Sequence, residues 1–244
     1  MLDHRPTGLQ KRPLHRIFTA VTGRYDLINR IITLGMDNGW RKKAALACLE
    51  GEPGRILDLC CGTGDLSLAL ARLAKYNPEI TGLDYSSPML EAACAKAARL
   101  PEGKMLSFVH GDVSRLPFAD SYFDCAGISF AFRNLAHKNP MTPQYMEEIL
   151  RVLRPGARFV IVESSQPSSA FVRFFFRLYL RWFVFPAGYL ISGNRSAYKY
   201  LAESTEHFYS AEEAHEFLLK SGFKDVTAKR LFFGAVAVYV ATTA

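Results

Sequence analysis

The stretch Arg55–Leu66, Arg-Ile-Leu-Asp-Leu-Cys-Cys-Gly-Thr-Gly-Asp-Leu, constrains the fold more than any other part of the chain. It begins with an apolar run, Ile56, Leu57 and Leu59, which is typical of a parallel strand buried on both faces. Two glycines then permit backbone angles and close ligand approach that a Cβ would block. A helix over about residues 66–75 would direct its N-terminal amides at this turn. The pattern predicts a small-ligand site at the carboxyl end of a strand in an open α/β sheet.

The residues around Gly62 and Gly64 indicate which ligand this is. Asp84 lies twenty residues after Gly64 and closes a second apolar run, where an acid can accept both hydroxyls of a ribose. A dinucleotide motif would have a third glycine where this chain has Ser67. Asp65 follows the second glycine directly, so a phosphate would be repelled and a cation attracted. These features favour S-adenosylmethionine, which has a ribose and a sulfonium but no phosphate.

Several motifs resemble those of known enzymes. The glycine stretch and the later Leu-Asp-Tyr-Ser-x-x-Met-Leu resemble motif I and its sequel in class I methyltransferases. Four further motifs are Arg24-Tyr-Asp-Leu-Ile-Asn29, Gly111–Phe118, Ile128–Asn134 and Tyr198–Ser204. Together the motifs resemble the quinone C-methyltransferases of menaquinone and ubiquinone biosynthesis, over about Phe18 to Tyr239.

The glycine turn, Asp84 and the resemblance together give a set of expected cofactor-binding residues. They are Asp58, Gly62, Thr63, Gly64, Asp84, Tyr85, Asp112, Val113 and Ser129. Asp112 would accept the adenine amine, and the backbone amide of Val113 would reach a ring nitrogen. Thr63 would lie near the methionine portion. Each has a structural alternative, since Asp112 could cap a turn before Pro117, and Ser129 could be a small packed strand residue.

Methyl transfer to carbon requires an electron-rich ring, and a hydroquinone provides one if a phenolic proton leaves as the bond forms. Phenols ionise near pH 10, so a group must stabilise the oxyanion or accept the proton. We expect Arg133 and Asn134 to hold the oxygen, because an arginine stays protonated and is a poor base. Tyr25 and Asp26 could relay a proton through water, or form part of a capped surface helix. His137 is a weaker candidate base in an exposed-looking loop.

The central part of the chain alternates strand and helix patterns, which predicts a Rossmann-like parallel α/β sheet. The expected strands lie near 55–60, 80–84, 106–111, 123–129 and 157–163, with helices near 65–75, 88–99, 141–153 and 211–221. Two last strands, near 226–233 and 235–242, would form the C-terminal antiparallel hairpin of a class I methyltransferase sheet. The whole of 51–244 is the expected methyltransferase domain.

Residues 1–50 are expected to form a basic arm and a helical cap over the cofactor mouth. Residues 1–16 are basic, without the apolar run of a signal peptide. Apolar residues then recur at helical spacing up to Leu49. We expect Gly35 and Gly39 to interrupt this run and Trp40 to begin another helix that ends near Gly51.

Residues 165–204 are expected to form an inserted segment that faces substrate or membrane. Its aromatic run contains Arg173, Arg177 and Arg181 every four residues, so these form one stripe on an otherwise apolar helix. The run before Pro186 is too short and too charged to span a bilayer. It could lie at a membrane interface or line an apolar tunnel, or be a cap or homodimer helix with extended arginines.

The net charge of +7 favours an anionic partner surface. A nucleic acid is not expected, since no recognisable module is present and the aromatics cluster with aliphatic residues. An anionic membrane surface fits better. The five cysteines show no metal-binding spacing, so we expect no metal and a cytoplasmic protein with reduced thiols. The net charge and the aromatic segment add the expectation that it is peripherally membrane-associated.

The sequence therefore predicts an S-adenosylmethionine-dependent C-methyltransferase of a polyprenylated quinol, most simply demethylmenaquinol, or its counterpart in the ubiquinol pathway. Two alternatives stay open: a methyltransferase for a soluble aromatic molecule, and a non-catalytic cofactor-binding scaffold. One departure from the resembled family concerns the last strand, where Tyr239 stands at the position of a usual histidine. This departure leaves the identity of the quinone open.

Overall fold

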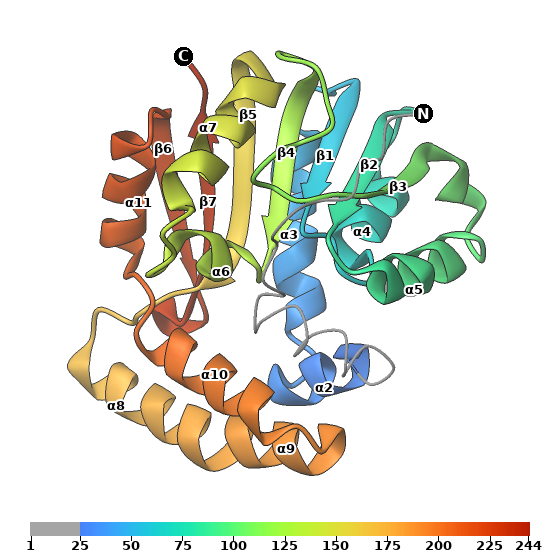
Figure 1. Ribbon diagram of the computed structural model, residues 1–244. Helices are drawn as coiled ribbons and strands as arrows, with labels where there is room; N and C mark the ends of the chain where they lie inside the picture. The colour runs from blue at the N-terminus through green and yellow to red at the C-terminus, as the bar shows by residue number, and fades with distance from the viewer. Residues whose placement is uncertain (1–24) are drawn as a thin grey trace, which may run out of the picture.

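The fold is a twisted sheet with helices on both faces and a separate helical layer at one end (Figure 1). The computed structural model describes residues 25–244. The predicted basic arm, the helical pattern before Tyr25 and the residue Arg24 lie outside these described residues.

The described residues form a seven-stranded sheet of order β3-β2-β1-β4-β5-β7-β6, in which β7 alone runs antiparallel to the other six strands. The strands are β1 (Arg55–Leu59), β2 (Glu79–Asp84), β3 (Leu106–His110), β4 (Phe123–Ser129), β5 (Leu153–Ser164), β6 (Lys224–Leu231) and β7 (Val236–Thr242). Since β1 pairs in parallel with both β2 and β4, the strand order reverses beside β1. Ligands of open α/β sheets bind at this switch point. The predicted sheet and its C-terminal hairpin are confirmed.

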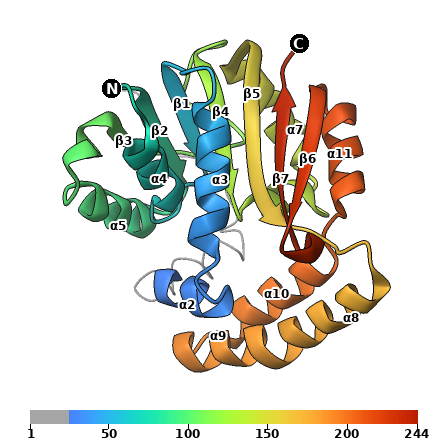
Figure 2. The ribbon, with the colours of Figure 1, turned by 180° about the vertical axis from the view of Figure 1, so that it is seen from behind.

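Two hydrophobic clusters cover the two faces of the sheet. On one face, α3 (Asp37–Leu49) and α4 (Asp65–Leu73) pack on Ile56 and Val160. On the other, α7 (Thr142–Val152) and α11 (Ala211–Lys220) pack on Leu57 and Phe159. Figure 2 shows α3 crossing the back of the sheet. The alternation of Ile56 and Leu57 between the clusters reflects the two-residue period of a strand, and α5 (Ser87–Ala97) lies against β2 and β3.

Some predicted boundaries were wrong. Helix α3 begins at Asp37 rather than Trp40, and Gly39 lies within it. The helical run is interrupted earlier, because Leu34 and Gly35 have left-handed backbone angles, with φ of 52° and 75°. Gly39 falls in the first turn of α3, where its amide needs no partner inside the helix.

Two further differences lie beside the expected site. A short helix that was not predicted, α6 (Phe132–Ala136), follows β4 and contains both Arg133 and Asn134. Five residues are too few to show a helical period in a sequence. Strand β3 ends at His110, so Asp112 lies in the following turn.

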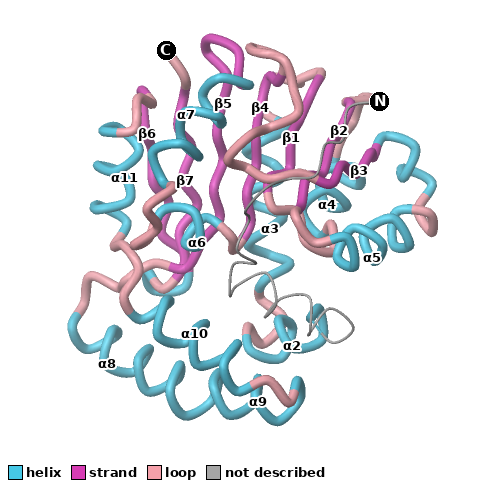
Figure 3. Tube along the Cα trace, viewed as in Figure 1, coloured by secondary structure: helices cyan, strands magenta, loops and turns pink. Residues whose placement is uncertain are grey.

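A second helical layer faces the carboxyl ends of the parallel strands (Figure 3). It consists of α2 (Tyr25–Ile32), α8 (Ala170–Tyr179), α9 (Phe185–Ser192) and α10 (Arg195–Glu206). A π-helical turn over 180–184 joins α8 to α9. Pro186 lies in the first turn of α9, where a missing amide costs little, so it does not end the helical run. This cap layer has its own small core around Ile28, Ala197 and Tyr198.

No helix among residues 25–244 is both long enough and apolar enough to cross a bilayer.

The packing of α9 against α10 depends on Gly188, so a larger residue at this position should lower the stability of the protein. A Cβ at Gly188 would lie 2.0 Å from Cδ1 of Tyr198, so Gly188→Ala must displace that ring. We expect a loss of about 1–3 kcal/mol, measured by thermal unfolding. Gly39→Ala is the matched control, because a Cβ there meets nothing within 4 Å, and helix propensity favours alanine by up to about 1 kcal/mol. Equal melting temperatures for the two variants would contradict this packing.

Candidate active site

The turn after β1 has the left-handed backbone angles that its two glycines predicted. Gly62 and Gly64 have φ of 55° and 81°, and Cys60 between the strand and the glycines has φ of 52°. Gly64 also packs closely, since a Cβ there would lie 3.0 Å from that of Ala93. Helix α4 begins at the next residue, so its first amides face the turn. Gly64 is therefore required for packing against α5, whereas Gly62 is half-buried and has open space where a Cβ would lie.

Asp84 at the end of β2 is bound to this turn. Its Oδ2 accepts a hydrogen bond from the amide of Gly62 at 2.9 Å, and its Oδ1 accepts one from the amide of Ser86 at 2.8 Å. Next to Asp84, Tyr85 stacks its ring at a tilt on His110, with centroids 5.6 Å apart. Asp84 therefore fixes the glycine turn at the end of β2.

Asp58, one residue before the end of β1, and Ser129, the last residue of the adjacent β4, have buried oxygens. Asp58 Oδ2 accepts bonds from the amide and hydroxyl of Ser67, at 2.9 and 2.6 Å. Among the described residues, neither Asp58 Oδ1 nor Ser129 Oγ has a hydrogen-bond partner. Burial raises the pKa of Asp58 to about 7. Unpaired buried oxygens cost free energy, so these two are available to a ligand group at the switch point.

Asp112 caps a turn, which is the structural role expected as the alternative to binding the adenine amine. Its Oδ1 accepts a hydrogen bond from the amide of Ser114 at 2.8 Å, and its backbone bridges to Arg115. The neighbouring Val113 is buried. The capping role of Asp112 leaves its second carboxylate oxygen with no hydrogen bond to the chain in the described part of the structure.

Lys96 of α5 links the glycine turn to the cap layer, and sequence reasoning missed it. Its Nζ lies 2.6 Å from Asp26 Oδ2, 2.6 Å from Asp65 Oδ1 and 2.9 Å from the hydroxyl of Thr63. Thr63 in turn donates to Asp26 Oδ1 at 2.6 Å. Asp65 also faces Arg41 at 3.6 Å. Its charge is therefore compensated within the chain, which removes the sequence argument that Asp65 would attract a cationic ligand.

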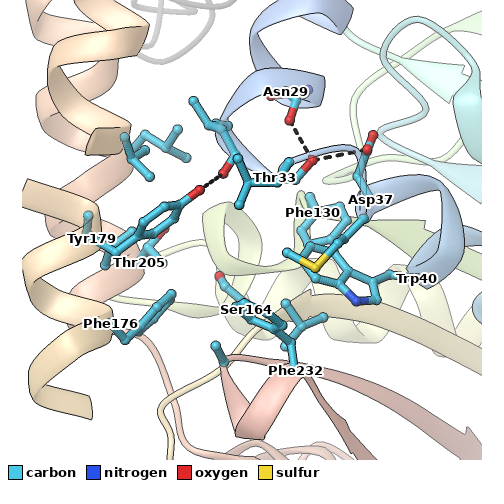
Figure 4. Close-up of a pocket in the computed structure, with 18 of the residues that line it drawn as sticks. Asn29, Thr33, Asp37, Trp40, Phe130, Ser164, Phe176, Tyr179, Thr205 and Phe232 are labelled. Atoms are coloured by element: carbon cyan, nitrogen blue, oxygen red, sulfur yellow. Dashed lines mark hydrogen bonds between the residues drawn. The ribbon is translucent and has the colours of Figure 1, made fainter. Parts of the chain in front are cut away.

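An apolar cavity of about 430 Å³ lies between the cap layer and the carboxyl edge of the sheet. Figure 4 shows aromatic side chains from both layers pointing into it, among them Trp40, Phe130 and Phe232 from the sheet side. The cap contributes Phe176 and Tyr179 of α8. A few polar groups interrupt this lining. They are Tyr25, Asn29, Thr33, Asp37, Arg41, Arg133, Ser164, Tyr179, Tyr198 and Thr205. An apolar cavity with few polar groups is the usual form of a small-molecule site.

Arg133 is held at the cavity wall by a buried carboxylate. Glu163 of β5 is fully buried, and its Oε1 accepts from Nη1 of Arg133 at 2.9 Å. Its Oε2 accepts from the Arg133 amide at 3.0 Å, and Nη1 also donates to the hydroxyl of Ser164 at 2.8 Å. Both the backbone and the guanidinium of Arg133 are therefore fixed. Nε of Arg133 has no hydrogen-bond partner among the described residues.

The other predicted catalytic residues do not all reach the cavity. Tyr25 lines it, and burial raises the pKa of its hydroxyl. Its neighbour Asp26 instead faces Lys96 and the glycine turn. Asn134 accepts a hydrogen bond from the hydroxyl of Tyr200 at 3.1 Å and is absent from the described lining. His137 packs on Phe208 and Tyr209, and burial lowers the pKa of its ring.

Tyr239, at the position where the resembled family usually has histidine, is fully buried in β7. Burial raises the pKa of its hydroxyl to about 12. It pairs with Ile161 of β5 and is not among the described residues that line the cavity.

Comparison with known proteins decides the family. The model of the ubiE/COQ5 methyltransferase family matches residues 7–243. The chain belongs to this family. It is therefore an S-adenosylmethionine-dependent methyltransferase, as its motifs predicted.

Curated relatives cover nearly the whole chain. The demethylmenaquinone methyltransferase of Lactiplantibacillus plantarum is 36% identical over 237 residues, which is 96% of this chain and 98% of the relative. The demethylmenaquinone methyltransferase of Thermus thermophilus is 39% identical over 224 residues, 92% of this chain and 98% of the relative.

Solved structures confirm the fold. A SAM-dependent methyltransferase from Thermotoga maritima superimposes with a TM-score of 0.62 at 19% identity, covering 95% of this chain and 100% of that one. A SAM dependent methyltransferase from Aquifex aeolicus gives a TM-score of 0.56 at 18% identity, covering 78% and 82%.

Sequence reasoning overlooked residues whose importance depends on contacts between distant segments. Lys96, Asp37 and Glu163 read as ordinary charges on a helix or at a strand end. A charged residue closing the apolar run of β5 was the one available signal, since a glutamate in a buried strand requires a partner. That signal would have singled out Glu163 but not its partner.

The Arg133–Glu163 pair yields a prediction. Glu163→Gln keeps the shape but leaves the buried guanidinium without its counter-charge, so we expect a loss of about 3 kcal/mol or more in unfolding free energy. Adding Arg133→Met should restore part of that loss, because no unpaired charge remains. Glu216→Gln is the control, since its pair with Lys220 is exposed on α11 and should matter little. Denaturant unfolding measures all three. A Glu163→Gln protein as stable as the control would contradict the pairing energy.

Proposed function

We propose that this enzyme methylates a ring carbon of a quinol with a long apolar tail, and specifically that it converts demethylmenaquinol to menaquinol. The observation that supports this most is the apolar cavity with Arg133 in its wall. Its volume of about 430 Å³ and its aromatic lining suit a bicyclic ring and the start of a polyprenyl tail. The two relatives described above are demethylmenaquinone methyltransferases, which agrees with this substrate.

The residues around the glycine turn fit S-adenosylmethionine, and we assign its site to them. The backbone of Gly62 and Gly64 would approach the methionine portion, together with Thr63. Asp84 would accept the ribose hydroxyls, with Tyr85 beside it. The remaining assigned residues are Asp58, Asp112, Val113 and Ser129, whose buried or spare oxygens and amide can bind polar groups. When bound, the cofactor supplies an electrophilic methyl group.

Arg133 is assigned to the developing oxyanion of the quinol, because a fixed and permanently charged guanidinium stabilises such a charge without reorganising. Tyr25 stays protonated and would donate a second hydrogen bond from α2. Asn134 would orient α10 through Tyr200. Asp26 would hold the cap to the glycine turn through Lys96.

Of the proposed N-terminal cap, α2 lies in the cap layer, whereas α3 packs on the sheet. Residues 51–244 form the proposed methyltransferase domain, and 165–204 its inserted segment. Within that segment, α8 and the π-helical turn that follows it have two apolar sides. Val172, Phe176 and Leu180 line the cavity, whereas the outward side exposes Phe171 and Trp182 by 72% and 74%.

The stripe of Arg173, Arg177 and Arg181 borders the outward apolar side of α8. An exposed apolar side next to a cationic stripe suits the surface of an anionic bilayer. We therefore propose a cytoplasmic enzyme that docks α8 and α9 on the membrane holding its quinol, without spanning it. Docking of a second copy on the same side would instead produce a homodimer.

The direct test is turnover of purified protein with reduced demethylmenaquinone and S-adenosylmethionine, followed by mass spectrometry of the quinone. We expect a ring-methylated product, and faster turnover for a long-tailed than for a tail-free naphthoquinol. Turnover of tail-free phenols at the same rate would favour the soluble-aromatic alternative. Cofactor binding without single-turnover methylation would favour a scaffold.

Asp84 provides a prediction for the cofactor site. Asp84→Ala removes charge-assisted hydrogen bonds worth about 1.5–3 kcal/mol each. Cofactor affinity, measured by calorimetry, should fall by ten-fold to several hundred-fold. The melting temperature should fall as well, because Asp84 also bonds the amides of Gly62 and Ser86. Asp84→Asn keeps one acceptor and should lie between the two. Normal cofactor affinity in Asp84→Ala would refute the ribose assignment.

Membrane docking predicts binding to vesicles. The protein should sediment with phosphatidylglycerol vesicles, less with phosphatidylcholine vesicles, and less again at high salt. Trp182→Ser should weaken this binding about ten-fold or more, since a buried aromatic contributes about 1.5–3 kcal/mol. Leu46→Ser is the matched control, being 50% exposed on α3 outside the cap layer. Equal binding of the two variants, or a dimer in sedimentation that Trp182→Ser dissolves, would contradict the membrane assignment.

A further inference from the structure

The cavity needs a group that accepts a proton, and its lining contains few candidates. Methylation of a quinol ring releases one proton overall. The lining arginines, Arg41 and Arg133, remain charged and cannot accept one. Burial raises the pKa of each lining tyrosine, Tyr25, Tyr179 and Tyr198, so these stay protonated donors at neutral pH. Among the described lining residues, Asp37 is the one carboxylate, and no histidine accompanies it.

Asp37 is held as a buried anion at this wall. It is 2% exposed at the start of α3, and its Oδ2 is paired with Nη1 of Arg41 one turn along the helix. Its Oδ1 lies 3.1 Å from the hydroxyl of Thr33 and 3.8 Å from Nε of Arg30. The Thr33 hydroxyl also lies 2.7 Å from the backbone oxygen of Asn29, and with one proton it can donate to only one of them. Oδ1 therefore retains capacity for another donor.

We propose that Asp37 is the catalytic residue that accepts the phenolic proton of the quinol, at the cavity wall formed by α2 and α3. Figure 4 shows Asp37 and Thr33 on the same side of the cavity as Trp40 and Phe130. This assignment rests on the proposed function. Asp37 would accept the proton, and the charge of Arg133 would stabilise the oxygen.

The proton balance sets when Asp37 acts. Burial alone would raise the pKa of Asp37, but the charge and the hydrogen bond of Arg41 outweigh burial and hold that pKa below the ordinary value. Complete transfer from a phenol, which ionises near pH 10, is uphill by about six powers of ten or more. The O–H proton would therefore move to Asp37 only as methyl transfer proceeds. In that step the O–H bonding pair would form a C=O bond, the ring C=C pair would form the carbon–methyl bond, and the sulfur–methyl bond would break with its electron pair staying on sulfur. The ring carbon then loses its own proton to water while Asp37 returns a proton to the oxygen.

Several charged groups surround Asp37 and bear on any pH dependence. Arg30 faces it from α2, Arg41 from its own helix, and Asp65 of α4 lies behind Arg41 at 3.6 Å. Tyr25 and Arg133 line the same cavity. The two neighbouring arginines outweigh the more distant carboxylate, so Asp37 is ionised throughout the neutral range.

The test compares wild type with Asp37→Asn, which keeps the shape and removes the base. With the reduced short-tailed demethylmenaquinone as substrate, we expect kcat to fall 10²- to 10⁴-fold. KM should change only a few-fold, and cofactor affinity by calorimetry should stay within three-fold. Glu148→Gln is the matched control, since it breaks a carboxylate–arginine pair with Arg151 on α7, outside the described lining. Its kcat should equal that of wild type. A kcat for Asp37→Asn within three-fold of wild type would overturn the proposal.

A second measurement needs neither turnover nor cofactor and separates a catalytic role from a structural one. The probe is 4-nitro-1-naphthol, whose neutral and ionised forms differ in absorbance. A carboxylate that accepts the naphthol proton in a hydrogen bond disfavours the naphtholate, so binding to wild type should raise the pKa of the probe above its value in water. Binding to Asp37→Asn should lower it by at least one unit relative to wild type. A lowered value in wild type, or equal values in both proteins, would overturn the proposal even if kcat falls.

The two experiments also distinguish the failure of this proposal from failure of the proposed function. Absence of any wild-type turnover of demethylmenaquinol would reject the quinol substrate. Normal wild-type turnover together with unchanged kcat in Asp37→Asn would reject Asp37 alone. If Asp37→Asn does not fold, the wild-type naphthol titration still decides, because its direction depends on whether a carboxylate or an arginine dominates at the hydroxyl.

Discussion

The parallel pairing of β1 with both β2 and β4 is the constraint on which the site depends. It places the ends of three strands at one edge and divides the connecting helices between two faces. Asp84 and Ser129 end their strands and Asp58 lies one residue before the end of β1, so the three are brought to the same edge although they are far apart in sequence. The glycine turn lies at this edge because it directly follows β1, and a Cβ at Gly64 would press on Ala93 and Phe108.

That edge is closed by the cap layer, and the closure depends on charges rather than on a continuous apolar interface. Lys96 joins Asp26 of α2 to Thr63 and Asp65 at the glycine turn. Arg30 of α2 also faces Asp37 of α3 at 3.8 Å, and Arg41 connects Asp37 to Asp65 of α4. Helix α2 of the cap is therefore positioned by directional contacts between charged groups. The apolar residues of the cap are left to line the cavity and the outward side of α8.

The cavity combines an apolar interior with a small number of fixed ions. Burying an ion is costly unless a partner compensates it, and both Arg133 and Asp37 have one, Glu163 and Arg41 respectively. These partners keep the ionic groups charged where water is scarce, which strengthens their interaction with a substrate. An apolar cavity alone would bind a quinol, whereas the paired ions provide fixed charges that can act on the quinol hydroxyl.

The sequence by itself determined the α/β sheet, the glycine turn, the position of Asp84 at a strand end and the family. These features depend on local patterns, namely continuous apolar runs, glycines that permit unusual backbone angles, and short motifs. The prediction that Gly39 interrupts the helical run was wrong, because a helix tolerates a glycine in its first turn. Helix α6 was not predicted, because five residues are too few to show a helical period.

Only the tertiary structure decided which residues act together. It separated Tyr25 from Asp26 although they are adjacent, since successive residues of a helix point in different directions. It neutralised Asp65 with Lys96 and Arg41, and it placed Glu163 against Arg133 across thirty residues of chain. Such partnerships depend on how strands and helices stack in three dimensions. No local pattern in the sequence records that information.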